Sequence, residues 1–276
     1  MCGRYAASAN VGELVEEFDV DLDRTAEPTR SLLRSAQQPP AGSPDFNMAP
    51  TKLAPVVLTR AAKDHPSAVS RQLRLLSWGL VPAWSKDPSG SARMINARAE
   101  TVRSKPAFAK AVSARRCLVP AVGWYEWQVS PTALDAKGKP RKQPFFIERA
   151  DGDLLAMAGI YEFWRDPTVA EPDDPAAWLV SFSVLTTAAE PGLDRIHDRQ
   201  PLVVEDEDRD RWLDPGADVD VIVDLLTTGR PGRFTAYPVG RAVGSNRANG
   251  PGLIEPAPEA DLVGVVDPTT GEVIGG

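Results

Sequence analysis

Twenty-six prolines and 21 glycines separate short apolar runs along this chain of 276 residues. Chain breakers at this density leave little room for long helices and favour many short strands. We predict strands in six runs enriched in Val, Ile, Phe, Trp or Leu, at residues 54–59, 73–78, 117–127, 144–149, 154–162 and 178–186. Six such runs can form a sheet or a barrel, so we expect an α+β class in one domain.

Helices are predicted where apolar residues recur at spacings of three and four. The clearest case is residues 11–18, where Val11, Leu14, Val15 and Phe18 share one face and Asn10 is available as the N-cap. Further helical patterns occur at residues 102–114, 205–213 and 218–226.

Turn-forming residues predict the connections between these elements. The segment Ala-Asp-Gly-Asp at 150–153 has the composition of a hairpin turn, so we expect the strands on either side of it to pair antiparallel. Surface insertions are expected at about residues 23–46, 128–143 and 165–177, and a loose tail at 257–276.

Charge excludes a histone-like polycation, because 38 acidic and 31 basic side chains give a net charge of −7. The segment 93–127 nevertheless carries seven basic residues and two acidic ones. It could face phosphates, although a solvated basic surface explains the charge equally well. No apolar run is long enough to span a bilayer and no secretory signal is recognisable, so we expect a cytoplasmic protein without membrane contact.

The two cysteines, Cys2 and Cys117, are too few for a disulfide scaffold or a four-cysteine zinc site. Cys117 lies in an apolar strand pattern and is expected in the core. Cys2 follows the initiator methionine and is small, which favours removal of Met1. An α-amino group titrates near ~7.7 to 8.0 and a thiol near ~8.5, so the new terminus would offer an amine and some thiolate to a carbonyl. The alternative is that Cys2 is simply a small residue at a frayed end.

Three other segments place reactive side chains in unusual settings. Glu126 lies among large aromatic residues in Gly-Trp-Tyr-Glu-Trp, which would raise its pKa and prepare it for proton transfer, unless an arginine pairs with it. Strand alternation from residue 96 would align Asn96, Arg98 and Glu100 on one face. His197 is the titratable candidate of the two histidines, since His65 lies in a polar loop. Histidine in a loop is also compatible with a structural role.

Tryptophans offer stacking surfaces for nucleobases. Trp78 and Trp84 are the first and last residues of the segment Trp-Gly-Leu-Val-Pro-Ala-Trp and could form such a platform. Both side chains are equally compatible with a place in the core.

Taken together, the chain resembles the SRAP family (SOS-response-associated peptidases) from residue 2 to about 256. The motifs that carry the resemblance, in family order, are Met1-Cys2-Gly3-Arg4-Tyr5, Asn47-Met48-Ala49-Pro50-Thr51, Trp78-Gly79-Leu80-Val81-Pro82, Asn96-Ala97-Arg98-Ala99-Glu100-Thr101, Cys117-Leu118-Val119-Pro120, Gly123-Trp124-Tyr125-Glu126-Trp127, Ala158-Gly159-Ile160-Tyr161, Leu185-Thr186-Thr187-Ala188-Ala189 and Ile196-His197-Asp198-Arg199 followed by Pro201. Gln200 stands where the family often has methionine.

The resemblance implies a single domain with a mainly antiparallel, barrel-like twisted sheet flanked by short helices. It also implies covalent capture of abasic sites in single-stranded DNA, with Cys2 forming a thiazolidine on the opened sugar. By similarity, the catalytic residues would be Cys2, Asn96, Glu126 and His197. The DNA-binding residues would be Arg4, Pro50, Trp78, Trp84, Arg98, Trp127, Thr187 and Arg199. Neither a metal nor a cofactor is required, and we expect a monomer that associates with the nucleoid when it binds DNA.

Two alternatives from other classes remain open on sequence alone. One is a cysteine peptidase that uses Cys2 with His197 and Glu126, perhaps on its own N-terminus. The other is a module that binds single-stranded or modified DNA without any covalent chemistry.

Overall fold

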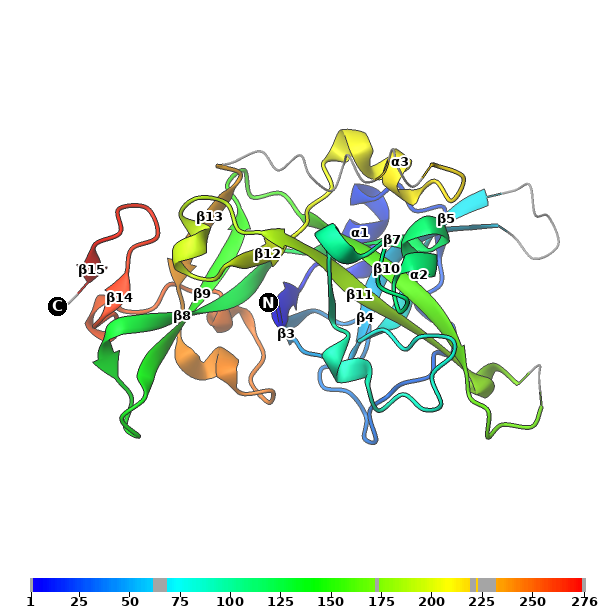
Figure 1. Cartoon of the computed structure of the whole chain (residues 1–276), viewed down its shortest axis with the longest axis horizontal. Helices are drawn as coiled ribbons and strands as arrows, with labels where there is room; N and C mark the ends of the chain where they lie inside the picture. The colour runs from blue at the N-terminus through cyan, green and yellow to red at the C-terminus, as the bar shows by residue number, and fades with distance from the viewer. Residues whose placement is uncertain (1, 62–68, 172–173, 219–221, 223–231, 275–276) are drawn as a thin grey trace.

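Two β-sheets pack side by side in the computed structural model, which describes residues 2–61, 69–171, 174–218, 222 and 232–274 (Figure 1). One sheet has eight strands and the other five. A third, two-stranded sheet lies near the C-terminus. Most pairings are antiparallel and the helices are short, which confirms the α+β class expected from the sequence.

Five strands of the larger sheet close into a barrel. They are β4 (Leu53–Ala61), β5 (Val69–Trp78), β7 (Arg116–Ala121), β10 (Leu155–Arg165) and β11 (Trp178–Ala188). Their order is β11-β10-β7-β4-β5, and a parallel pairing of Ser77 with Ser181 and of Trp78 with Phe182 joins β5 back to β11. Three short strands extend this sheet: β2 (Leu22–Asp23), β6 (Asn96–Arg98) and β12 (Arg199–Pro201). The barrel-like core expected from the resemblance is therefore present.

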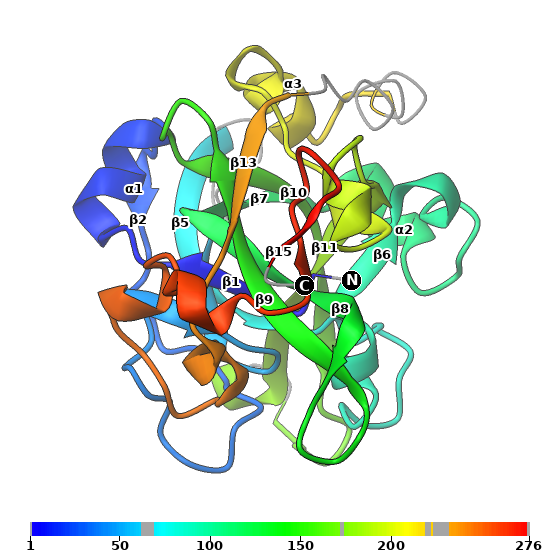
Figure 2. The same cartoon turned by 90° about the vertical axis from the view of Figure 1, so that its left-hand side faces the viewer.

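The second sheet carries the start of the chain in its interior. Its order is β13-β9-β8-β1-β3, and every pairing is antiparallel. The strands are β1 (Arg4–Ala7), β3 (Asp45–Met48), β8 (Gly123–Leu134), β9 (Pro140–Arg149) and β13 (Phe234–Pro238). Figure 2 shows this sheet turned toward the viewer, and the pairings place β1 between β8 and β3. Because β1 is not an edge strand, the residues that precede it lie between structured elements.

Short helices cover the outside of the barrel. The α-helices whose residues are all described are α1 (Val11–Glu17), α2 (Ala109–Ala114) and α3 (Arg209–Leu213). The 3₁₀ helices are Ser91–Arg93, Ala99–Thr101, Pro175–Ala177, Leu193–Arg195, Asp206–Asp208, Arg241–Gly244, Pro251–Leu253 and Glu259–Asp261. No described helix is long and apolar enough to cross a membrane.

The first helix follows the sequence prediction closely. Asn10 caps it, because its side chain accepts a hydrogen bond from the Glu13 N–H at 3.0 Å while the Glu13 carboxylate accepts one from the Asn10 N–H at 2.8 Å. Within the helix Leu14 is the buried residue, and Phe18 is the C-cap. The other helices are shorter than predicted: only 109–114 of 102–114 is α-helical, and 205–213 divides into a 3₁₀ turn and α3. Most of the helix predicted at 218–226 lies outside the described residues, as does His65.

Two strand predictions were wrong in their connectivity. The predicted strand 117–127 is interrupted at Val122, where the chain passes from β7 in the barrel to β8 in the second sheet. Gly123 permits this crossing, because a Cβ there would lie 2.4 Å from the Phe146 ring and 2.6 Å from the Ile147 carbonyl oxygen. The expected hairpin across 150–153 does not form, since β9 pairs with β8 and β13 whereas β10 pairs with β7 and β11. Turn residues reverse the chain locally but do not select a partner strand.

Two segments expected to be irregular are structured. Residues 128–143 form the outer part of the β8–β9 hairpin rather than a loop, with Leu134 paired to Pro140. The tail beyond residue 256 contains β14 (Val265–Val266) paired with β15 (Val273–Ile274), and it buries Leu262 and Val265 in the main core. These apolar side chains are the physical reason why the tail is not loose. In contrast, residues 24–44, which are all described, contain neither helix nor strand.

Candidate active site

The second sheet brings Cys2 next to Glu126. In the antiparallel pairing of β1 with β8, Arg4 lies opposite Tyr125 and Tyr5 opposite Trp124, so the chain before Arg4 runs beside the residues that follow Tyr125. Cys2 is fully buried in the main core cluster, and its Sγ–H lies 3.7 Å from the Arg4 carbonyl oxygen. Its position is therefore fixed by the fold, in contrast to a frayed end.

Asn96 holds the backbone of Cys2 from the other sheet. It opens β6, which runs parallel to β11 in a register that places Asn96 opposite Val184. The Asn96 Nδ2 donates a hydrogen bond to the Cys2 carbonyl oxygen at 2.7 Å. The Oδ1 of the same amide is buried and has no hydrogen-bond partner among the described residues. A buried acceptor in this state is suited to receive an N–H group.

Glu126 is a carboxyl group whose surroundings favour its neutral form. It is 3% exposed, and burial raises its pKa to about 7. The positive charge of the chain's amino terminus opposes this rise, and the carboxylate of Asp198 adds to it. At neutral pH the group exists in both protonation states, which is the condition that general acid–base catalysis requires.

The thiol of Cys2 differs from the sequence-based expectation. Burial, and then the neighbouring Glu126, raise its pKa well above that of an ordinary cysteine. The expectation of an accessible thiolate at neutral pH is therefore wrong for the folded chain. A thiol in this state would need a base to lose its proton, and Glu126 is the charged group whose effect on the Cys2 pKa is largest.

His197 approaches the same end of the chain from the loop after the 3₁₀ helix Leu193–Arg195. Its Nδ1 accepts a hydrogen bond from the Arg199 N–H at 3.0 Å and lies 2.9 Å from the Asp198 carboxylate. Burial and the positive amino terminus lower its pKa. The lowered pKa favours the neutral ring, and the hydrogen bond from the Arg199 N–H to Nδ1 is compatible with a proton on Nε2. The positive charge of the amino terminus affects the pKa of both Glu126 and His197.

Three candidate DNA-binding residues gather at one edge of the barrel. Arg98 lies opposite Thr186 in the β6–β11 pairing, Thr187 lies in β11, and Arg199 lies opposite Ala188 in β12. Arg98 is exposed. Arg199 forms a bidentate ion pair with Glu100, with N–O distances of 2.7 and 2.9 Å, and also donates to the Thr186 carbonyl oxygen. Glu100 lies in a 3₁₀ turn and not on the strand face that the sequence predicted.

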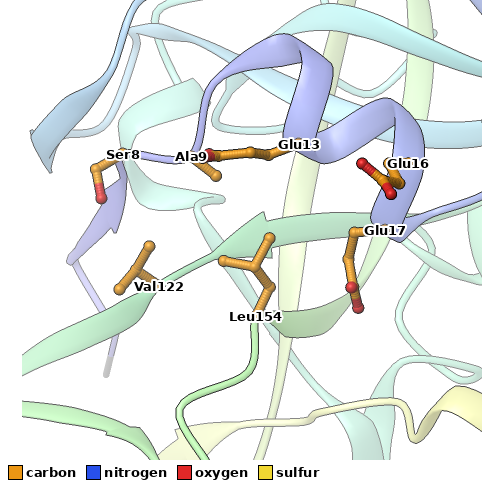
Figure 3. Close-up of a pocket in the computed structure, with 7 residues that line it drawn as sticks. All are labelled: Ser8, Ala9, Glu13, Glu16, Glu17, Val122 and Leu154. Carbon is orange, nitrogen blue, oxygen red and sulfur yellow. The ribbon is translucent and has the colours of Figure 1, made fainter.

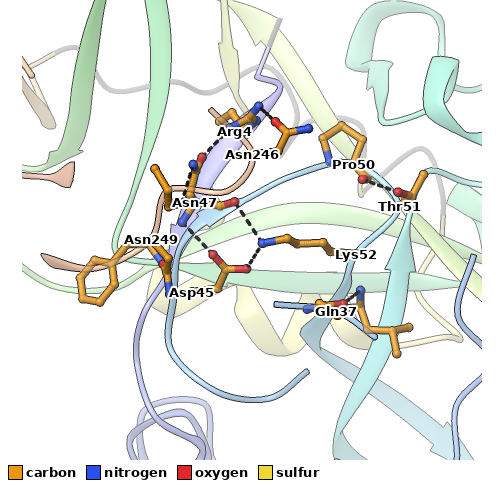
Figure 4. Close-up of polar contacts among 12 residues, drawn as sticks. Arg4, Gln37, Asp45, Asn47, Pro50, Thr51, Lys52, Asn246 and Asn249 are labelled. Atoms are coloured by element: carbon orange, nitrogen blue, oxygen red, sulfur yellow. Dashed lines mark hydrogen bonds and ion pairs between the residues drawn. The ribbon is translucent and has the colours of Figure 1, made fainter. Parts of the chain in front are cut away.

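Arg4 is held in a polar network that the sequence did not reveal (Figure 4). Its guanidinium donates to Asn47 Oδ1 at 2.6 Å, to the Val243 carbonyl oxygen at 2.9 Å and to the Asn246 side chain. Asn47 is fully buried, and its Nδ2 donates to the carbonyl oxygens of residues 243, 245 and 248. The amide thereby fixes both Arg4 and the loop that follows β13. In the sequence, the one indication of this network was the asparagine at the start of the motif Asn-Met-Ala-Pro-Thr.

The aromatic candidates divide into buried and exposed side chains. Trp78 is fully buried, with its ring parallel to Phe182 at 6.4 Å and its Nε1 donating to the Ile95 carbonyl oxygen. The prediction that Trp78 stacks on a base was wrong, because the side chain has no exposed face. Trp84 is 68% exposed in the loop after β5. Trp127 and Pro50 are both half-buried.

Comparisons with known proteins identify the family of this chain. The model for "SOS response associated peptidase (SRAP)" matches residues 1–246. The chain belongs to the SRAP family. It is 33% identical over 258 residues to the "Abasic site processing protein YoqW" of Bacillus subtilis, covering 92% of this chain and 99% of that protein. It is 32% identical to "Abasic site processing protein YedK" of Escherichia coli, covering 93% of this chain and 100% of the relative.

A mammalian relative and a solved structure extend the comparison. The chain is 30% identical to "Abasic site processing protein HMCES" of Rattus norvegicus, covering 93% of this chain and 76% of that protein. Among solved structures, a protein from Bacteroides thetaiotaomicron superposes with a TM-score of 0.70 at 23% identity, over 93% of this chain and 100% of the other. That likeness shows a shared fold.

A separate cavity of about 570 Å³ lies beside α1 and is lined by none of the predicted SRAP site residues (Figure 3). Its wall consists of Ser8, Ala9, Glu13, Glu16, Glu17, Val122 and Leu154. The three carboxylates would repel a phosphate backbone, so this cavity does not suit DNA. Among the described residues, no group of three or more His, Cys, Asp or Glu side chains is arranged to hold a metal ion.

Proposed function

We propose that this SRAP protein captures abasic sites in single-stranded DNA by a covalent bond to Cys2. The observation that carries the proposal is the anchoring of Cys2 by Asn96 beside Glu126, whose pKa is raised to about 7. Relatives over nearly the whole chain are named abasic site processing proteins, which supports the choice of substrate. The proposal includes removal of Met1, so that the amine and the thiol belong to one residue.

The chemistry uses the aldehyde at C1′ of the ring-opened sugar. The Cys2 amine adds to this carbon to give a carbinolamine, and loss of water then gives a Schiff base. The thiol adds to the same carbon, its sulfur forming the C–S bond while its proton leaves and the imine nitrogen gains one. The product is a five-membered thiazolidine, so aldehyde plus aminothiol become ring plus water. No oxidant or reductant is consumed.

Two of the proton transfers can be assigned to Glu126, and two other side chains can orient the reacting groups. Glu126 in its neutral form protonates the departing hydroxyl, and as a carboxylate it accepts the thiol proton. Neutral His197 donates a hydrogen bond to the sugar ring oxygen as the ring opens, while the proton of the 1′ hydroxyl passes through water to that oxygen. The unpartnered Asn96 Oδ1 accepts a hydrogen bond from the Cys2 amine and directs its lone pair.

DNA binding in this proposal uses positive charge and stacking near the site. Arg98 and Arg199 contact phosphates on either side of the lesion, with Thr187 between them on the same edge. Arg4, two residues after Cys2, adds a further positive charge. Trp84 and Trp127 offer stacking surfaces and Pro50 an apolar contact, and Trp78 has no part in binding.

The decisive experiment combines intact protein mass with a denaturing gel. The purified protein is incubated with a single-stranded oligonucleotide that contains one abasic site, and with a matched oligonucleotide whose site is a reduced sugar without an aldehyde. We expect loss of the Met1 mass, and an adduct equal to protein plus DNA minus one water only with the aldehyde. Processed protein that forms no adduct would refute the proposal.

The same measurement separates the two alternatives. A cysteine peptidase would cleave peptide bonds beyond Met1, and a noncovalent module would bind both oligonucleotides without a mass change. The raised pKa of the buried Cys2 thiol does not favour a peptidase, which depends on a thiolate.

A further inference from the structure

The side-chain amide of Gln128 links the C-terminal segment both to the strand that carries Glu126 and to the loop that carries His197. Gln128 follows Glu126 by two residues on β8, so both side chains lie on the same face of the strand. Gln128 is 2% exposed. Its Oε1 accepts a hydrogen bond from the Val266 N–H at 2.8 Å, and its Nε2 donates to the Val266 carbonyl oxygen at 2.9 Å.

The same amide also reaches the loop that carries His197. The Gln128 Nε2 lies 3.2 Å from the Arg195 carbonyl oxygen, and Arg195 precedes His197 by two residues. The guanidinium of Arg195 turns back to the C-terminal segment, where it donates to the carbonyl oxygens of Pro268 and Thr269 at 2.5 and 3.3 Å. Three segments distant in sequence are thus joined at one point.

Apolar packing strengthens this junction. Leu262 and Val265 from the tail belong to the same buried cluster as Leu193 and Ile196 from the His197 loop. Beside them, Ser130 of β8 donates to the Gly264 carbonyl oxygen at 2.6 Å. Gly264 has φ +75°, and a Cβ there would lie 2.6 Å from the Ser130 hydroxyl, so the tail approaches β8 as closely as glycine allows. Figure 1 shows β14 lying against the end of β8.

We propose that Gln128 is a positioning residue for the reaction, and that the C-terminal hairpin (residues 262–274) is a clamp that fixes the His197 loop relative to Glu126. This inference rests on the proposed function. The clamp lies beyond residues 1–246, the part matched by the family model. As a consequence, Gln128 and the C-terminal hairpin set the distance between the Glu126 carboxyl and the His197 imidazole without taking part in the reaction themselves.

Gln143 provides a matched control. It lies directly opposite Gln128 in the β8–β9 pairing and is 3% exposed. Its Nε2 donates to the Pro144 and Val239 carbonyl oxygens, so its hydrogen bonds join β9 to the residue that follows β13 and not to the tail or the His197 loop. Gln128→Leu and Gln143→Leu each remove one buried amide of the same size from adjacent positions.

The test compares single-turnover crosslinking by the full chain at saturating abasic oligonucleotide, noncovalent binding of the reduced-sugar oligonucleotide, and the thermal midpoint. We expect both variants to lose similar thermal stability and to bind DNA as the wild type does. Only Gln128→Leu should slow crosslinking, by about tenfold or more, since small displacements of catalytic groups have effects of this size.

The pH dependence of the crosslinking rate is a second measurement, and it would not change if Gln128 only stabilised the fold. The groups that act on Glu126 are the amino terminus and Asp198, and Glu126 in turn acts on Cys2. Release of the loop takes Asp198 away, so the inflection assigned to Glu126 should shift to lower pH in Gln128→Leu alone. Equal slowing by both variants, or a wild-type rate in Gln128→Leu, would overturn the clamp. Absence of any adduct in the wild type would instead refute the proposed function.

Discussion

The side-chain amide of Asn96 and the backbone carbonyl of Cys2 are joined by a 2.7 Å hydrogen bond that connects the two sheets. Asn96 stands in β6 beside the barrel, whereas Cys2 immediately precedes the part of β1 that pairs with β8. Cys2 is therefore positioned by both halves of the fold. This arrangement leads to several predictions about the chemistry and the stability of the protein.

The thiol should be needed for a stable product and not for the first encounter with the aldehyde. In Cys2→Ser the amine can still form a Schiff base, but a hydroxyl closes the ring poorly. We expect no adduct that survives heating in denaturant, together with an adduct that borohydride traps. A wild-type yield of stable adduct from this variant would contradict the proposed ring closure.

Glu126→Gln should slow crosslinking by about 10²- to 10⁴-fold, the range typical of a lost general acid–base group. Where thiol addition limits the rate, the wild-type rate should rise with pH through about 7, because the carboxylate form accepts the thiol proton. The variant should lose this inflection while binding reduced-sugar DNA normally. Rates measured across the pH range in both proteins check the assignment, and an unchanged inflection would transfer the role to another group.

The same substitution should stabilise the folded protein at alkaline pH. The pKa of Glu126 rises from 4.5 to about 7 on folding, so between these values the folded state holds a proton that the unfolded state has lost. Stability due to this group is complete below the lower value and falls as pH rises to the upper one. We expect Glu126→Gln to raise the free energy of unfolding at pH 8 by up to about 3 kcal/mol, and to have little effect at pH 4. Urea denaturation at the two pH values measures the difference.

Arg98→Ala should weaken DNA binding uniformly across sequences and reduce the slope of log K against log salt by about one. Its side chain is exposed beside the site, so folding should be unaffected. Arg211→Ala, an exposed arginine on α3, is the matched control and should leave the slope unchanged. Equal slopes of log K against log salt for the wild type and both variants would show that Arg98 does not contact a phosphate.

Glu100 competes with DNA phosphate for Arg199 in the proposed interface. Glu100→Gln removes the carboxylate that holds this guanidinium at 2.7 and 2.9 Å. Exposed ion pairs contribute about 0–1 kcal/mol, so we expect affinity to increase by up to about fivefold. Fluorescence titration with reduced-sugar DNA measures the change. Weaker binding would mean that Glu100 orients Arg199 for the phosphate.

Lys52 and Asp45 form a buried ion pair below the Arg4 network, with an N–O distance of 2.6 Å (Figure 4). Lys52→Met leaves the Asp45 charge uncompensated, which should destabilise the fold by about 3–5 kcal/mol. The double variant Asp45→Asn with Lys52→Met should recover much of this loss. If the single and double variants unfold at the same urea concentration, the charge of Asp45 is not the cause.

Local sequence patterns predicted those features that depend on neighbours in the chain. Asn10 and Glu13 satisfy each other within one turn, and strand alternation correctly placed Trp124 and Glu126 on the face away from Tyr125. Cys117 is buried as its apolar surroundings indicated. The family resemblance added the barrel, which no local pattern could specify.

Features that depend on distant partners were not predictable in this way. The turn at 150–153 reverses the chain, but the neighbours of β9 and β10 are chosen by sheets built from remote segments. Trp78 is enclosed by Tyr5 and Phe182, which lie far away in sequence, so its burial could not be read from its own segment. The thiol pKa of Cys2 likewise follows from burial that only the folded chain provides.

The interior position of β1 also imposes an order of events on protein synthesis. Chains emerge from the ribosome N-terminus first, and the β8 segment that pairs with β1 begins only at residue 123. More than a hundred residues must therefore be translated before Cys2 can be enclosed. During that interval the nascent end is accessible to the aminopeptidase that would free its amine, whereas in the folded chain Cys2 is buried.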